Sequence, residues 1–218
     1  MIVSRIGILV IVVVAVALSA CFDSSSHARA VFVLIDTSGT YAKEIDKAQR
    51  IIDYLLAELN PGDSLAVARI DSASFSERDI IASMTFSDRP SVANGEKRQF
   101  RKRIDDFART VQGSQHTDIS GGLLQAIGYL DETRAGKRYI LVFSDMKEDL
   151  QKGHVRDIQY NFANTQVVAL HVTKLSSDSR NPKEYVTRLE NWQRLVEGGG
   201  GQWRIINDFT HLASVFTG

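Results

Sequence analysis

Apolar residues along the chain show two kinds of spacing, and the alternation of the two predicts the fold class. Long segments with an apolar residue every three or four positions indicate helices that bury one face. Short unbroken apolar runs are typical of strands buried on both faces of a sheet. The predicted helices cover residues 41–59, about 100–111, 117–135 and 183–197, with a short one from about 209. The predicted strands cover residues 30–35, 64–70, 79–86, 139–143, 166–172 and 202–206.

Strands that alternate with helices indicate a three-layer α/β fold, a doubly wound, Rossmann-like sheet that is mostly parallel and has helices on both faces. The strands at 64–70 and 79–86 are joined by a connection too short for a helical crossover. We therefore expect them to pair antiparallel, as one edge of the sheet. Pro90 and Gly95 predict a loop before the second helix, and Gly136 stands where a C-terminal helix cap is expected.

The N-terminal segment has the pattern of an export signal. Arg5 supplies a positive charge, residues 6–18 are apolar without a break, and small residues follow. A bilayer usually needs about 20 apolar residues, so an uncleaved membrane anchor is the weaker interpretation. We predict a signal peptide over residues 1–20.

The sequence Leu18-Ser19-Ala20-Cys21 resembles the bacterial lipobox, in which the cysteine is acylated and becomes the new N-terminus. The resemblance implies a lipid on Cys21, a short tether over residues 21–29 and a location outside the cytoplasm, on the periplasmic side or the cell surface. Cys21 is the only cysteine, so the chain has no internal disulfide. An incidental buried cysteine is the alternative.

The rest of the chain, residues 30–218, has the size of one domain. The 26 basic and 26 acidic residues of the full chain balance. Such a balance gives no reason to expect a nucleic acid as the partner.

Oxygen-bearing side chains gather at three loops that leave strands or enter helices. They are residues 36–40, 116–118 and 144–145. In open α/β sheets ligands bind beyond the carboxyl ends of the strands, where such loops lie. Hydroxyl and carboxylate oxygens suit Mg²⁺, Mn²⁺ or Ca²⁺, and the absence of available cysteines and of clustered histidines argues against structural zinc. Two carboxylates, Asp36 and Asp145, would just neutralise a divalent ion.

These loops resemble the metal-ion-dependent adhesion site of von Willebrand factor A domains. The resemblance rests on Asp36-x-Ser38-x-Thr40, on Thr117-Asp118-Ile119 at a helix start, and on Ile140-Leu141-Val142-Phe143-Ser144-Asp145. It implies that Ser38 and Thr40 bind the cation directly, that Asp36 and Asp145 act mainly through water, and that Thr117 does either. It further implies Mg²⁺ as the first candidate, and a protein partner that offers an Asp or Glu to the open coordination position.

Two positions depart from this pattern. Family members often have glycine where this chain has His116, before the threonine, and where it has Met146, after the third aspartate. Loop shape and the charge at the rim of the site are the properties that these changes affect.

Other interpretations stay open for the same residues. Residues 36–40 and 117–118 would also suit a turn and a helix N-cap. The segment 36–40 also resembles the Asp-x-x-Gly-Thr motif of haloacid-dehalogenase-like phosphotransferases, in which Asp36 would be the nucleophile. In the phosphatases of that superfamily an aspartate acts as general acid where this chain has Ser38, and a serine hydroxyl is a poor acid near neutral pH. We therefore interpret the chain as a binding domain and not as an enzyme.

Overall fold

The computed structural model describes residues 27–39, 41–72, 76–151 and 158–216. The predicted signal peptide, Cys21 and Thr40 lie outside the described residues, so the lipid anchor stays a prediction. Within those four stretches, no helix has the length and apolar character needed to cross a membrane.

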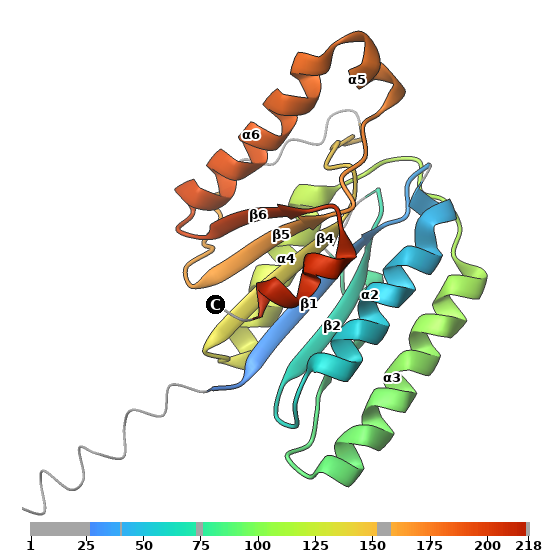
Figure 1. Ribbon diagram of the computed structural model, residues 1–218, viewed down its shortest axis with the longest axis vertical. Helices are drawn as coiled ribbons and strands as arrows, with labels where there is room; N and C mark the ends of the chain where they lie inside the picture. Colours follow the sequence, from blue (N-terminus) through green and yellow to red (C-terminus); the bar gives the residue numbers. More distant parts are fainter. Residues whose placement is uncertain (1–26, 40, 73–75, 152–157, 217–218) are drawn as a thin grey trace, which may run out of the picture.

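A six-stranded sheet forms the centre of the domain (Figure 1), in the order β3-β2-β1-β4-β5-β6. Its strands are β1 (Arg29–Asp36), β2 (Ser64–Ile70), β3 (Ile80–Thr85), β4 (Lys137–Phe143), β5 (Thr165–Leu170) and β6 (Gln202–Ile206). Neighbouring strands run parallel except β2 and β3, which pair antiparallel at one edge. The predicted α/β class, the parallel sheet and its single antiparallel edge strand are confirmed.

Helices cover both faces of this sheet, as the alternating pattern predicts. They are η1 (Tyr41–Glu44), α2 (Ile45–Glu58), η2 (Glu77–Asp79), α3 (Pro90–Thr110), α4 (Ile119–Thr133), α5 (Ser176–Arg180), α6 (Pro182–Gly198) and η3 (Phe209–Val215). Buried side chains of α2, α3 and η3 pack on one face, and those of α4 and α6 pack on the other. The central strand β1 is buried on both sides, which explains its unbroken apolar run.

Two local predictions were wrong. Helix α3 begins at Pro90, where a loop was expected, because the fixed φ of proline suits the first position of a helix. The cap of α4 is Arg134, with a left-handed φ of 52°, and not Gly136. An arginine accepts this conformation here at the modest cost of a non-glycine residue in that region.

The connections reverse direction at β1. From β1 the chain passes through α2 to β2 on one side, and it later returns through α4 to β4 on the other side. The carboxyl ends of β1 and β4 therefore lie at the topological switch point of the sheet, where α/β proteins bind their ligands.

Candidate metal centre

Asp36 is the last residue of β1, and Ser144 follows the last residue of β4. The two strands are parallel neighbours, with Ile35 paired to Phe143, so the next residue of each lies side by side. The Ser144 hydroxyl donates to Asp36 Oδ2 over 2.6 Å. Adjacent strands thus bring together the first and third predicted loops.

The other oxygen of Asp36 orients Ser38. Asp36 Oδ1 accepts hydrogen bonds from the Ser38 backbone N–H, at 2.8 Å, and from the Ser38 hydroxyl, at 2.6 Å. A hydroxyl that gives its proton to a carboxylate keeps its lone pairs available to a cation. Asp36 itself is 1% exposed, so it acts from beneath Ser38 and not from the cavity surface.

Backbone hydrogen bonds tie the second loop to the first and third. Ser114 N–H donates to the Thr37 carbonyl at 3.0 Å, beside the first loop. Thr117 and Asp149 exchange two N–H to carbonyl bonds, each 2.9 Å long, beside the third loop. The segment that carries Thr117 is therefore fixed between the other two, although long stretches of sequence separate them.

Asp118 is a helix cap and Thr117 is not. The Asp118 side chain caps α4 by accepting the Gly121 N–H at 2.8 Å, and the residue is fully buried. For Asp118 the cap interpretation is therefore sufficient. Thr117 Oγ1 has no hydrogen bond to any other described residue and remains available.

Ser38, Thr117 and Asp145 line one cavity of about 400 Å³. Of the five predicted ligands, these three share that surface, Asp36 supports Ser38 from below, and Thr40 lies outside the described residues. The cavity also has Tyr41, Ser114, Gln115, Lys147 and Asp149 in its wall.

Asp145 presents one carboxylate oxygen to this cavity. Its Oδ1 accepts the Lys147 N–H at 2.7 Å, while Oδ2 has no hydrogen-bond partner among the described residues. Within that part of the chain the only fully buried side-chain oxygen or nitrogen without a partner is Gln125 Oε1. The free oxygen of Asp145 therefore reaches solvent in the cavity and is free to bind a ligand.

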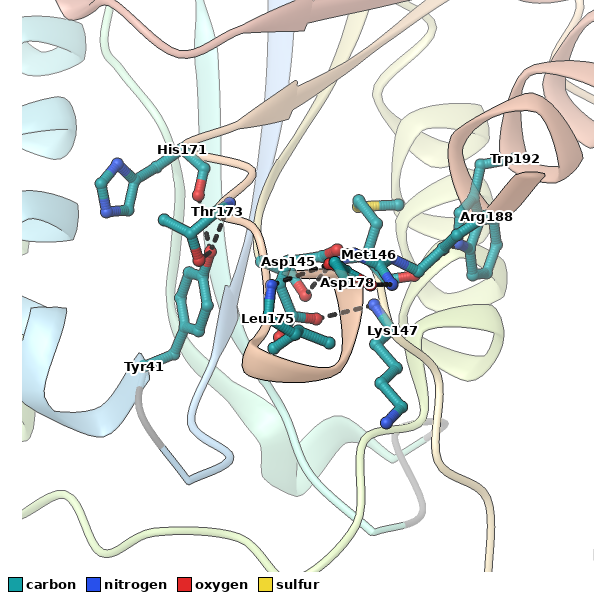
Figure 2. Close-up of polar contacts among 11 residues, drawn as sticks. Tyr41, Asp145, Met146, Lys147, His171, Thr173, Leu175, Asp178, Arg188 and Trp192 are labelled. Carbon is teal, nitrogen blue, oxygen red and sulfur yellow. Dashed lines mark hydrogen bonds and ion pairs between the residues drawn. The ribbon is translucent and has the colours of Figure 1, made fainter. Parts of the chain in front are cut away.

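Helix α6 holds the two peptide groups that follow this carboxylate along the chain (Figure 2). Arg188 Nε donates to the Asp145 carbonyl at 3.1 Å, and Trp192 Nε1 donates to the Met146 carbonyl at 2.8 Å. Arg188 also binds both oxygens of Asp178 from α5, at 3.1 and 2.8 Å. The loop after β4 is thereby fixed to a helix that sequence reasoning assigned only to the core.

Met146 explains one departure from the family pattern. Its φ is 63°, in the left-handed region that favours glycine, and its side chain is fully buried. The loop therefore keeps the backbone shape that glycine adopts easily, at a cost of about 1–2 kcal/mol for another residue. Burial of the methionine side chain against the α4 and α6 face offsets that cost.

Both acids of the centre are held where ionisation is unfavourable. Burial raises the pKa of Asp36, and the hydrogen bonds from Ser144 and Ser38 oppose this only in part. Burial also raises the pKa of Asp145, helped by the charge of Asp36, while the Lys147 N–H and the Arg188 guanidinium lower it. The charge of Asp36 thus disfavours ionisation of Asp145, and a divalent cation between the two acids would favour their ionised forms.

The chemistry of these donors fits a hard cation with few charged ligands. Hydroxyl oxygens from Ser38 and Thr117 and a carboxylate oxygen from Asp145 face the same cavity. Within the described ranges, no group of three or more His, Cys, Asp or Glu residues could hold a metal. A centre here would therefore combine hydroxyl oxygens with two acids. Mg²⁺ sites commonly use one or two carboxylates and keep several waters.

Sequence reasoning missed two polar residues that shape the cavity. Tyr41 was predicted only as part of a helix face, yet its hydroxyl donates to the His171 carbonyl at 2.6 Å and lies 3.1 Å from Thr173 Oγ1 (Figure 2). Ser114 was not predicted at all, and its hydroxyl bonds with Asp71 Oδ1 at 2.7 Å. No spacing in the sequence indicates either contact, because both join segments distant along the chain.

Comparison with known proteins identifies the fold. No protein-family model matches the chain, and no curated protein matches it significantly. The chain is similar to the pilus adhesin SpaC from Lactobacillus rhamnosus GG, in its open conformation, with 11% identity and a TM-score of 0.54. The match covers 87% of this chain and 29% of the adhesin.

Two further solved structures are similar at lower scores. One is a von Willebrand factor type A protein from Catenulispora acidiphila, with 11% identity and a TM-score of 0.48 over 88% of this chain and 41% of that one. The other is an aerotolerance-related membrane protein from Bacteroides fragilis, with 14% identity and a TM-score of 0.46 over 86% and 96% of the two chains. Neither score supports an argument by itself.

The strand order defines a doubly wound α/β protein, and the candidate site lies at its switch point. This strand order, with one antiparallel edge strand and helices on both faces, is consistent with the von Willebrand A-like fold that the sequence motifs predict. Similarity at these identities shows the fold alone. The chain spans less than half the length of the adhesin and of the Catenulispora protein, so their activities are not transferred to it.

Proposed function

We propose that this chain is a protein-binding domain whose divalent cation, Mg²⁺ in the first instance, accepts an Asp or Glu side chain from a partner. Ser38, Thr40 and Thr117 would supply hydroxyl oxygens, and Asp36 and Asp145 would supply the charge. The observation that carries the proposal is that Ser38, Thr117 and Asp145, from three separate segments, line one cavity above the Asp36 carboxylate.

The charges of the site support a partner carboxylate. When ionised, Asp36 and Asp145 together balance the charge of one divalent cation. The hydroxyl ligands are neutral, so the cation keeps enough Lewis acidity to bind one more carboxylate oxygen. Mg²⁺ prefers six oxygen ligands and usually keeps several waters, so one position can be exchanged for a partner oxygen. Mn²⁺ and Ca²⁺ take the same donor types and remain alternatives.

The competing function is phosphotransfer with Asp36 as nucleophile. A nucleophilic carboxylate has to reach the phosphorus atom. Asp36 is 1% exposed, and its two oxygens accept three hydrogen bonds from Ser38 and Ser144. These contacts favour a supporting role for Asp36 over a nucleophilic one.

The proposed setting is the bacterial cell envelope. A lipid on Cys21 and the tether up to residue 29 would hold the domain outside the cytoplasm, close to a membrane. One solved protein with a similar fold is a pilus adhesin by its name. A role in adhesion or in the assembly of an envelope complex agrees with this setting.

The cation site is tested by titrating the full chain in detergent with Mn²⁺, followed by electron paramagnetic resonance, and by displacing Mn²⁺ with Mg²⁺ in the presence of acetate. One saturable site is expected. Ser38→Ala and Asp36→Ala should each weaken it at least about tenfold, the usual effect of losing a ligand or its support. Absence of saturable binding to the wild type would refute the proposal.

Controls separate the site from general effects of substitution. Ser83→Ala changes an exposed serine of β3, away from the switch point, and should bind Mn²⁺ like the wild type. A phosphatase screen with generic phosphomonoesters addresses the competing function. Mg²⁺-dependent turnover that Asp36→Asn abolishes would favour phosphotransfer.

A further inference from the structure

Lys147 lies where two cavities meet. It lines the cavity of the candidate metal centre, and it also lines a larger cavity of about 690 Å³ between α6 and residues 146–148. We call this larger cavity the α6 groove. Lys147 is thus common to the walls of the candidate metal centre and of the α6 groove.

The floor of the α6 groove suits an apolar side chain. Trp192 and Leu195 offer apolar surface there, with the fully buried Met146 beneath them, and all three pack against the core on the α4 and α6 face. The hydrogen bonds of the Trp192 indole and of the Met146 carbonyl are already satisfied by each other. An incoming apolar residue would therefore cover hydrocarbon without leaving a buried polar group unpaired.

The charged side chains between the two cavities differ in whether they have a partner. Glu148 lines the groove, and its Oε1 accepts the Ser120 N–H at the start of α4, at 2.7 Å. Arg188 is neutralised by Asp178. Lys147 is exposed and, among the described residues, has no ion pair, and Figure 2 shows its side chain extending away from Asp145. Lys147 is thus an available cation beside the open position of the centre.

From this arrangement we propose that the partner segment carries a second acidic residue next to the one that reaches the cation, followed by an apolar residue. The second acid pairs with Lys147, and the apolar side chain occupies the α6 groove. The inference rests on the proposed function, because the first acid needs the cation. It adds the chemistry that would select one acidic segment among many.

The test is a selection of random displayed peptides on the full chain in detergent with Mg²⁺, eluted by a chelator. A synthetic peptide of the enriched sequence is then measured by fluorescence anisotropy against the wild type, Lys147→Glu and Arg103→Glu. Arg103 is an exposed cation of α3, on the opposite face of the sheet, and serves as the matched control. A urea unfolding midpoint of Lys147→Glu like that of the wild type confirms that this variant keeps its fold.

We expect chelator-eluted peptides to share two adjacent acids and a following apolar residue. Lys147→Glu should weaken binding about tenfold, because it replaces an attraction at the rim with a repulsion. Arg103→Glu should have no effect, and changing the second acid of the peptide to its amide should remove most of the difference.

Two outcomes would overturn the inference, and they differ from failure of the proposed function. Chelator-eluted peptides with a single acid, or equal affinities of Lys147→Glu and Arg103→Glu, would contradict the role of Lys147 while leaving the cation site intact. Recovery of no chelator-sensitive peptide would contradict the proposed function, and the inference with it.

Discussion

Trp192 donates its indole N–H to the carbonyl oxygen of Met146, and this bond of 2.8 Å ties α6 to the loop that presents Asp145. Arg188, four residues earlier on α6, reaches the preceding carbonyl, that of Asp145. Residues four apart lie on one face of a helix, so a single face of α6 holds two successive peptide groups. The position of the Asp145 carboxylate therefore depends on a helix that does not contribute to the cavity beside Ser38.

The bond from Trp192 gives the first prediction. Trp192→Phe keeps most of the ring volume but leaves the buried Met146 carbonyl without its donor. We expect a loss of about 1–2 kcal/mol in the free energy of unfolding, measured with urea. Trp203→Phe is the matched control, because among the described residues its indole has no hydrogen-bond partner. Equal losses in the two variants would show that the Met146 contact contributes nothing specific.

The ion pair of Arg188 gives a prediction that depends on pH. Hydrogen bonding to Arg188 lowers the pKa of Asp178, so the pair stabilises the protein when the carboxylate is ionised. Arg188→Ala should cost about 2 kcal/mol near pH 7, a value typical of hydrogen bonds to charged groups. The lowered pKa means that this cost persists above about pH 3.9 and is lost as the pH falls through the folded value.

Unfolding of the wild type and Arg188→Ala, measured from pH 7 down to pH 3, checks this dependence. Arg188→Lys is the informative companion, because it keeps the charge but cannot bind two carboxylate oxygens and the Asp145 carbonyl together. A difference between wild type and Arg188→Ala that stays constant to the lowest pH would contradict the ion-pair explanation. It would point to packing of Arg188 over the Tyr185 ring, 5.4 Å away.

Substitutions of Met146 separate two contributions to stability. One is the strain of its left-handed backbone conformation, and the other is the burial of its side chain. Met146→Ala and Met146→Gly both remove the buried side chain, which should destabilise the protein by about 2–5 kcal/mol. Only glycine also relieves the left-handed φ of 63°. We therefore expect Met146→Gly to unfold at a higher urea concentration than Met146→Ala, although glycine usually lowers stability relative to alanine. The reverse order would show that this backbone conformation carries no strain.

The fold was largely predictable because its strands are buried on both faces. The unbroken apolar runs at β1, β4 and β5 have no other common explanation at that length, and the short link between β2 and β3 fixes their antiparallel pairing. The start of α3 was missed because Pro90 signals a turn as readily as a first helical residue. Local sequence does not distinguish these two uses of proline.

The convergence of three of the five predicted ligands on one cavity could be predicted from the sequence, whereas the contacts that hold them in place could not. Motif order indicated that Ser38, Thr117 and Asp145 would meet, and they line one cavity. The hydrogen bond from Ser144 to Asp36 depends on β1 and β4 being neighbours, which no local pattern fixes. The contacts of Arg188 and Trp192 with backbone carbonyls leave no trace in the sequence, because any residue in the loop supplies a carbonyl.

The buried charge of Asp36 should destabilise the folded protein when no cation is bound. The same charge should be required for stabilisation by Mg²⁺. Burial raises the pKa of Asp36 in the folded protein. Protonated Asp36 therefore favours the folded state at low pH, and this contribution is lost as the pH rises through the raised pKa. Asp36→Asn removes the buried charge and keeps an oxygen that can accept from Ser38. In chelator, the variant should therefore gain stability relative to the wild type as the pH rises from about 4 to 7.

Mg²⁺ should reverse this order. A cation that binds only the folded wild type adds about 1.4 kcal/mol when its free concentration is ten times its Kd, and Asp36→Asn should gain little because one of the two acids is gone. Thermal unfolding of both proteins at pH 7, with chelator and with increasing Mg²⁺, measures the two effects together. If Mg²⁺ raises the Tm of both proteins equally, the cation binds elsewhere. If Asp36→Asn is the less stable protein in chelator at every pH, the Asp36 carboxylate holds its loops together by hydrogen bonding, and its buried charge is not the cost that we infer.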